Sequence, residues 1–216
     1  MLIACWSVKG GVGTTVVAAG LAVTTGGDPA TPALLVDLAG DLPTCLGIDQ
    51  PTGQGIAEWS RAGADAPPDA LSRLEVPVTP ALGLVPRGDG PVQAHKGGLL
   101  ARVLALSGRL VVVDCGRPQE GSTAMQVAAE AHRSLLVTRL CLMGLRRATR
   151  AAVRPSGVVV VRDPGRALTA RDVEACVGAP VVAEIAVDPA VARSVDAGLL
   201  VSRLPRSFGG ALGSAA

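Results

Sequence analysis

The first 22 residues constrain the fold more than any other stretch of this chain. Residues 2–8 form an apolar run long enough for one buried strand. Residues 9–15 contain three glycines, which allow backbone angles and close approach that a Cβ would block. Small and apolar residues at helical spacing follow over 16–22. The sequence therefore predicts a strand, a glycine-rich loop and a helix in direct succession.

A strand, a glycine loop and a helix form the context of a phosphate-binding loop. Gly13 and Thr15 match the pattern G-x-x-x-x-G-K-[ST]. Val8 stands at its first glycine position and Thr14 at its lysine position, whereas a lysine begins the loop as Lys9. Loop N–H groups and a helix N-terminus together favour an anion. We expect this loop to bind the phosphates of a nucleotide through Gly10, Gly11, Val12, Gly13, Thr14 and Thr15. The alternative is an ordinary glycine turn between a strand and a helix.

Two later strands are expected to end in a carboxylate, Asp37 after residues 32–36 and Asp114 after residues 110–113. Ligands of open α/β sheets gather at the carboxyl ends of the strands, so both carboxylates are well placed. An apolar run ending in Asp is also the pattern of a Walker B strand, which holds Mg²⁺ through water. We expect Asp114 and Thr15 to hold the metal and the Gly116 N–H to meet a γ-phosphate. A helix N-cap or a solvated strand end is the alternative for Asp114.

Strands and helices alternate along the chain, which predicts a doubly wound, mostly parallel sheet with helices on both faces. The length of 216 residues fits one such α/β domain. We expect this domain over residues 1–206 and a flexible, Gly/Ala/Ser-rich tail over 207–216. Besides the helix over 16–22, the expected helices cover 55–61, 68–74, 99–106, 122–130, 142–153, 169–176 and 188–196.

Composition excludes several classes of protein. A net charge of +2 is too small to indicate nucleic acid or an anionic membrane as a partner. Two histidines and five scattered cysteines argue against a His-based triad and against a Cys/His metal site. No apolar stretch approaches the ~20 residues of a membrane span, and a strand starts too early to leave room for a signal peptide. We therefore expect a cytoplasmic protein.

Two arginines in the expected helix over 142–153 and a third directly beyond it are spaced by four, which places them on one helix face. A solvated helix face and a patch for nucleic acid or an acidic partner both fit this spacing. The three residues are Arg146, Arg150 and Arg154.

With the loop, Asp37 and Asp114 in place, the chain resembles the MinD/ParA class of P-loop proteins with a deviant Walker A motif. The run Lys9-Gly10-Gly11-Val12-Gly13-x-Thr15 is similar to the signature of that class, and the resemblance covers roughly residues 2–204. Within the class it looks most like the TadZ/CpaE-type branch, which includes septum-site-determining-like proteins of pilus and secretion loci. The resemblance implies a P-loop NTPase fold, ATP and Mg²⁺ as cofactors, and a homodimer in which Lys9 reaches the partner's nucleotide.

Two departures from that class bear on hydrolysis. Thr14 lacks the charge that bridges the β- and γ-phosphates, and Ala39 stands where active relatives carry a second switch I carboxylate. Losing two charged groups removes several kcal/mol of transition-state stabilisation. The resemblance thus implies a switch that positions a pilus, secretion or septum-site machine with slow hydrolysis, and the catalytic candidates are Lys9 and Asp37. An active ParA/MinD-type ATPase and a nucleotide-independent scaffold are the alternatives, and any location at a membrane or cell pole would come through a partner.

Overall fold

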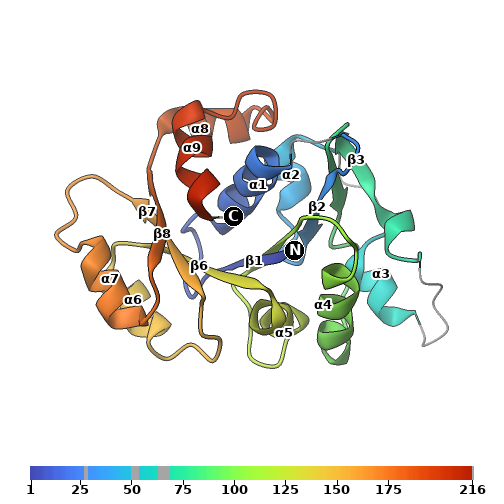
Figure 1. Ribbon diagram of the computed structural model, residues 1–216, viewed down its shortest axis with the longest axis horizontal. Coiled ribbons are helices and arrows are strands. Elements are labelled where there is room, and N and C mark those ends of the chain that lie inside the picture. The colour runs from blue at the N-terminus through green and yellow to red at the C-terminus, as the bar shows by residue number, and fades with distance from the viewer. Residues whose placement is uncertain (27–28, 50–53, 63–68, 216) are drawn as a thin grey trace.

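An eight-stranded sheet forms the centre of the molecule (Figure 1). The computed structural model describes residues 1–26, 29–49, 54–62 and 69–215. The strand order is β3-β4-β2-β5-β1-β6-β7-β8, and only the β3–β4 pair among these strands is antiparallel. The predicted single, mostly parallel sheet is therefore confirmed. The strands are β1 (Leu2–Trp6), β2 (Ala33–Asp37), β3 (Val76–Thr79), β4 (Leu82–Val85), β5 (Val111–Gly116), β6 (Arg133–Arg139), β7 (Gly157–Arg162) and β8 (Val181–Ala186).

Helices cover both faces of this sheet (Figure 1). One face carries α1 (Thr14–Thr25), α2 (Leu42–Leu46), α8 (Pro189–Asp196) and α9 (Arg206–Leu212). The other carries α3 (Ile56–Arg61), α4 (Gly97–Ala105), α5 (Thr123–Glu130), α6 (Leu142–Ala148) and α7 (Ala170–Val177). Short 3₁₀ turns occur at Ser72–Leu74, Ala94–Lys96 and Gly213–Ala215.

Two aliphatic cores result from this layering. Successive side chains of a strand point to opposite faces, so Leu2, Ala4 and Trp6 pack against α4 and α5, while Ile3 and Cys5 pack against α1. The central strands are buried on both faces, which explains why they read as continuous apolar runs in the sequence.

The segment before β4 differs from the prediction. The helix expected over 68–74 is reduced to the 3₁₀ turn Ser72–Leu74, and Pro68 lies outside the described residues. The following residues form β3, an edge strand that the sequence analysis does not predict. β3 pairs with β4 with an irregularity between Pro77 and Thr79. Proline is confined to edges and bulges of sheets because it cannot donate to the ladder, so this strand is short and irregular.

The tail expected to be flexible from Ser207 onwards is instead α9, which packs on α1. Phe208 and Leu212 are four residues apart and both are buried. A Cβ added to Gly20 of α1 would lie 2.4 Å from Cε1 of Phe208, so the absence of a side chain at Gly20 makes room for the ring. Burial of Phe208 and Leu212 therefore anchors α9 on the sheet, although the composition of this segment alone indicates mobility.

The arginine face predicted on residues 142–153 does not exist as one helix face. α6 ends at Ala148, and the Thr149 hydroxyl donates to the Arg146 carbonyl in the turn that follows. The chain leaves the helical path there, and Val153 is buried in the core. Arg146 thus lies on α6, while Arg150 and Arg154 lie beyond its end, and all three are exposed.

Candidate functional site

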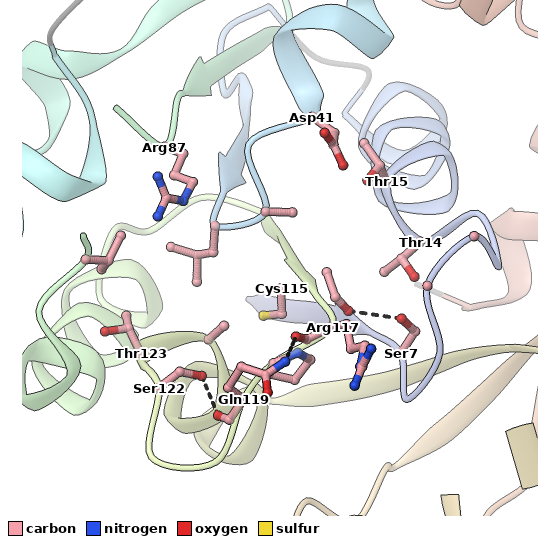
Figure 2. A pocket seen from close by; sticks show the side chains of 18 of the residues that line it. Ser7, Thr14, Thr15, Asp41, Arg87, Cys115, Arg117, Gln119, Ser122 and Thr123 are labelled. Atoms are coloured by element: carbon pink, nitrogen blue, oxygen red, sulfur yellow. Dashed lines mark hydrogen bonds between the residues drawn. The ribbon is translucent and has the colours of Figure 1, made fainter. Parts of the chain in front are cut away.

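A cleft of about 740 Å³ opens at the carboxyl ends of the central strands (Figure 2). Its walls come from the glycine loop after β1 and from the turns that follow β2, β4 and β5. Of the residues predicted to bind nucleotide, those that line this cleft are Gly10, Gly11, Gly13, Thr14, Thr15 and Gly116. The structure thus brings together residues that are up to about a hundred positions apart in the sequence, as expected for strand ends of an open α/β sheet.

The glycine loop owes its shape to two residues in the left-handed region. The φ angles of Gly11 and Gly13 are 73° and 98°, where a residue with a Cβ is strained. Gly13 is also the N-cap of α1, and no side chain caps that helix. Thr14 and Thr15 of the first helical turn line the cleft, and the N-cap of this turn has no side chain that could accept from its N–H groups, which suits a phosphate. Val12, in contrast, points into the core.

Asp114 lies at the end of β5 with its side chain fully buried. Its Oδ1 accepts from the Gly116 N–H at 2.9 Å. Burial raises the pKa of Asp114 to about 6; the Thr15 hydroxyl and the Gly116 N–H lower the pKa in part, and the charge of Asp37 raises it further. The other carboxylate oxygen, Oδ2, has no hydrogen-bond partner among the described residues.

An unpartnered, buried carboxylate oxygen next to a threonine hydroxyl is a donor set that fits Mg²⁺. Magnesium is held in phosphate sites by one or two protein oxygens together with water and phosphate oxygens. Among the described residues, no group of three or more His, Cys, Asp and Glu side chains could hold a metal. A metal in this cleft would therefore be bound by Asp114, Thr15 and the ligand's own phosphates.

Asp37 lies opposite Asp114 in the sheet but does not line the cleft. Its Oδ1 accepts from the N–H groups of Ala39 and Gly40 at 2.9 and 2.6 Å, and its Oδ2 accepts from the Leu42 N–H at 3.1 Å. Burial raises the pKa of Asp37, and these three hydrogen bonds work in the opposite direction. Asp37 therefore shapes the turn that carries Ala39 and Asp41, both of which line the cleft.

Hydrogen bonds of Gly116 connect the turn after β5 with Ser7, which precedes the glycine loop. Its N–H, which the sequence suggests for a γ-phosphate, donates to Asp114 within the same turn. Its carbonyl accepts twice from Ser7, from the backbone N–H at 2.8 Å and from the hydroxyl at 3.2 Å. Its φ of 56° and the 2.9 Å between an added Cβ and the Ala39 Cβ make glycine necessary at this position.

Lys9 stands apart from the cleft. It lines a smaller pocket of about 160 Å³ on another side of the glycine loop, together with Gly11, Val12 and residues at the end of β6 such as Arg139. Arg139 forms an ion pair with Asp163 at 2.7 Å. The predicted site residues are therefore divided: the glycine loop and Gly116 line the cleft, whereas Lys9 lines the smaller pocket.

Polar residues of the cleft wall that the sequence analysis missed include Ser7, Asp41, Arg87, Arg117, Gln119, Ser122 and Thr123. Arg117 was within reach of sequence reasoning, because it follows Asp114 by three residues at a strand end. Arg87 was not, since its turn after β4 gives no local sign that it faces the glycine loop.

No described helix is both long and apolar enough to cross a lipid bilayer.

No family model and no curated protein matches the sequence. Solved structures do match. The cell division ATPase MinD from Pyrococcus furiosus has a TM-score of 0.80 at 20% identity, covering 99% of this chain and 97% of that chain. A ParA family ATPase from Chlorobium tepidum TLS has a TM-score of 0.78 at 21% identity, covering 98% and 95%. The septum site-determining protein MinD from Pyrococcus horikoshii OT3, complexed with Mg-ADP, has a TM-score of 0.78 at 18% identity, covering 99% and 93%.

At these identities the likeness establishes the fold, which is that of the MinD and ParA ATPases over almost the full length of the chain. A shared fold does not by itself assign an activity. Function has to be argued from the cleft.

Proposed function

We propose that this chain is a nucleotide-dependent switch of the MinD/ParA kind, which binds ATP with Mg²⁺ and positions another cellular machine. The observation that carries the proposal is the unpartnered Oδ2 of Asp114, buried under the glycine loop and next to Thr15. A carboxylate whose charged form is made costly by burial is stabilised by a divalent cation. The MinD structure complexed with Mg-ADP has this fold, which supports a magnesium nucleotide as the ligand here.

Different residues of the cleft would bind the phosphates, hold the metal and position the neighbouring turn. The glycine loop and the first turn of α1 bind the phosphates through N–H groups, and Thr15 and Asp114 hold the metal. The Mg²⁺ neutralises charge on the phosphates when it is bound. Asp37 acts as a positioning residue, because its three backbone hydrogen bonds fix the turn with Ala39 and Asp41.

Hydrolysis in this cleft is slow in our proposal. Thr14 is 7% exposed and brings no charge to the phosphates, and Ala39 has no carboxylate to place a water molecule. Phosphoryl transfer depends on positioning and on charge neutralisation, so both changes weaken it. One observation favours the alternative of an active ATPase: Asp41, two residues after Ala39, also lines the cleft. A phosphate-release assay separates the two, since turnover at the rate of typical ATPases would favour the active enzyme.

We further propose that the chain forms a homodimer through the face that carries the cleft. Lys9 lies outside the cleft of its own protomer, which supports a role for it on the nucleotide of the partner protomer. The partners of the dimer are the pilus, secretion or cell-division proteins that the TadZ/CpaE-type resemblance implies. The protein would be cytoplasmic, and such a partner would recruit it to a membrane or cell pole. The arginines after α6 remain a candidate surface for nucleic acid or an acidic partner, because Arg146, Arg150 and Arg154 are exposed and outside the described ion pairs.

Titration calorimetry with ATP and MgCl₂ tests the binding claim directly. We expect saturable heat with a dissociation constant below about 1 mM, equivalent to roughly 4 kcal/mol of binding free energy. Asp114→Asn is expected to abolish the dependence of this binding on Mg²⁺ while leaving the glycine loop intact. Absence of heat from wild-type protein at millimolar ATP would favour the nucleotide-independent scaffold.

A further inference from the structure

The cleft contains positive charge that the glycine loop does not supply. Thr14 occupies the lysine position of the loop, and the cleft wall contains no lysine among the described residues. It does contain two arginines, Arg87 and Arg117. A triphosphate needs cations close to its oxygens, and a guanidinium can donate two parallel hydrogen bonds to one phosphate.

The backbone of Arg117 is fixed next to the glycine loop. The Gly116 carbonyl that accepts two hydrogen bonds from Ser7 belongs to the peptide bond leading into Arg117. Ser7 in turn follows the last residue of β1, two residues before the loop begins. Pro118 restricts the backbone of Arg117 to extended angles, and the Gln119 side-chain amide donates to the Arg117 carbonyl at 3.3 Å. Arg117 therefore enters the cleft from a defined position.

The guanidinium of Arg117 is available to a ligand. The side chain is exposed, and within the described part of the chain it has neither an ion pair nor a hydrogen bond. Figure 2 shows it extending from the turn after β5 on the side of the cleft where Ser7 and the loop lie. No internal interaction has to break before this side chain contacts a phosphate.

Arg87 is placed differently. Figure 2 shows it on the opposite wall, in the turn after β4. Its Cδ would lie 3.4 Å from a Cβ added to Gly40, and its Nη1 donates to the neighbouring Gly88 carbonyl at 3.5 Å. Arg87 thus lies against the turn after β2, away from Ser7.

From this geometry we propose that Arg117 binds the terminal phosphate of the nucleotide within its own protomer and supplies the charge that Thr14 lacks. The inference rests on the proposed function, since it assumes that a nucleotide binds in this cleft. Arg117 follows Asp114 by three residues on one turn, so the metal and the guanidinium face the same end of the triphosphate. The residue therefore distinguishes ATP from ADP by the charge of the third phosphate.

Calorimetry with Mg-ATP and Mg-ADP on the full chain tests this assignment. Arg117→Ala is expected to weaken ATP binding by about tenfold to a hundredfold, the value of a charge-assisted hydrogen bond, and ADP binding by less than about threefold. Thr14→Lys in the Arg117→Ala background is expected to restore ATP affinity to within about threefold of the wild type, because it returns a cation to the same phosphates. The matched control is Arg102→Ala on α4, an exposed arginine outside the cleft, which should change neither affinity.

The possible results separate the two proposals. A wild-type protein that binds neither nucleotide overturns the proposed function and this inference with it. A wild type that binds ATP, together with an Arg117→Ala variant of equal affinity, overturns the inference alone. Equal losses for ATP and ADP, or an ATP-selective loss in Arg87→Ala in place of Arg117→Ala, also overturn it. Circular dichroism of each variant verifies that the fold is retained.

Discussion

Asp37 and Asp114 are direct neighbours across strands β2 and β5, and both side chains are fully buried. Two carboxylates in such a position disfavour each other's charge. Three backbone N–H groups donate hydrogen bonds to the carboxylate oxygens of Asp37, whereas Oδ2 of Asp114 has no hydrogen-bond partner among the described residues. This difference separates a carboxylate that builds a turn from one that can bind a cation.

The raised pKa of Asp114 makes stability depend on pH. With a folded pKa of about 6 against an ordinary value of 3.8, the folded state holds the proton more tightly than the unfolded state. The stabilisation by this group is therefore complete below about pH 4 and is lost as the pH rises through about 6. At pH 7.5 the charged carboxylate costs about 2–3 kcal/mol of unfolding free energy in the nucleotide-free protein.

We therefore expect Asp114→Asn to be more stable than the wild type at pH 7.5 by about that amount, and the difference to vanish towards pH 4. Urea denaturation monitored by circular dichroism at a series of pH values measures this difference in unfolding free energy. Stability curves of wild type and variant that run parallel from pH 4 to pH 8 would contradict this prediction.

Lys9→Ala is expected to prevent ATP-dependent dimerisation while ATP binding by the monomer changes little, because Lys9 does not line the cleft of its own chain. Light scattering with and without Mg-ATP gives the molar mass of the protein in solution and so distinguishes monomer from dimer. The chain offers one matched control, since Lys96 is the only other lysine and lies at the end of a 3₁₀ turn. Dimers of unchanged mass in the Lys9→Ala variant would exclude the role across the interface.

The double variant Thr14→Lys/Ala39→Asp is expected to raise the rate of phosphate release by at least about tenfold over the wild type. It returns one cation and one carboxylate to the cleft wall, where each contributes to positioning and charge neutralisation. Ala192→Asp on α8, an exposed alanine outside the cleft, controls for the added carboxylate. If phosphate release stays at the wild-type rate, these two positions do not explain slow turnover.

Phe208→Ala is expected to lower the free energy of unfolding by about 3–5 kcal/mol, since it removes a buried ring from the contact between α9 and α1. Gly20→Ala should also destabilise, because its Cβ would overlap the same ring. Leu106→Ala serves as the control, as that side chain is 84% exposed. A flexible tail would instead give a Phe208→Ala variant with wild-type stability in urea.

Local patterns were sufficient to predict the centre of the fold. Apolar runs that end in Asp37 and Asp114 are strands because their residues are buried on both sides, and the glycine loop is recognisable because Gly11 and Gly13 need left-handed angles. These features depend on neighbours in the sequence. That the glycine loop and the end of β5 lie side by side follows from the parallel pairing of β1 with β5.

What the sequence did not predict depends on distant contacts. α9 has the composition of a loop, and only the approach of Phe208 to Gly20 makes it a buried helix. The sequence analysis predicts a helix over 142–153, but α6 ends at Ala148 and Val153 beyond it is buried in the core. Arg87 faces the cleft only because β4 lies next to β2 in the sheet.

The short strand β3 also limits how copies of this protein can associate. It forms one outer edge of the sheet, and unpaired edges invite strand addition from another molecule. Pro77 provides no N–H for such pairing, and the irregularity after it disturbs the spacing of the remaining groups. Growth of a continuous sheet from molecule to molecule is therefore disfavoured at this edge.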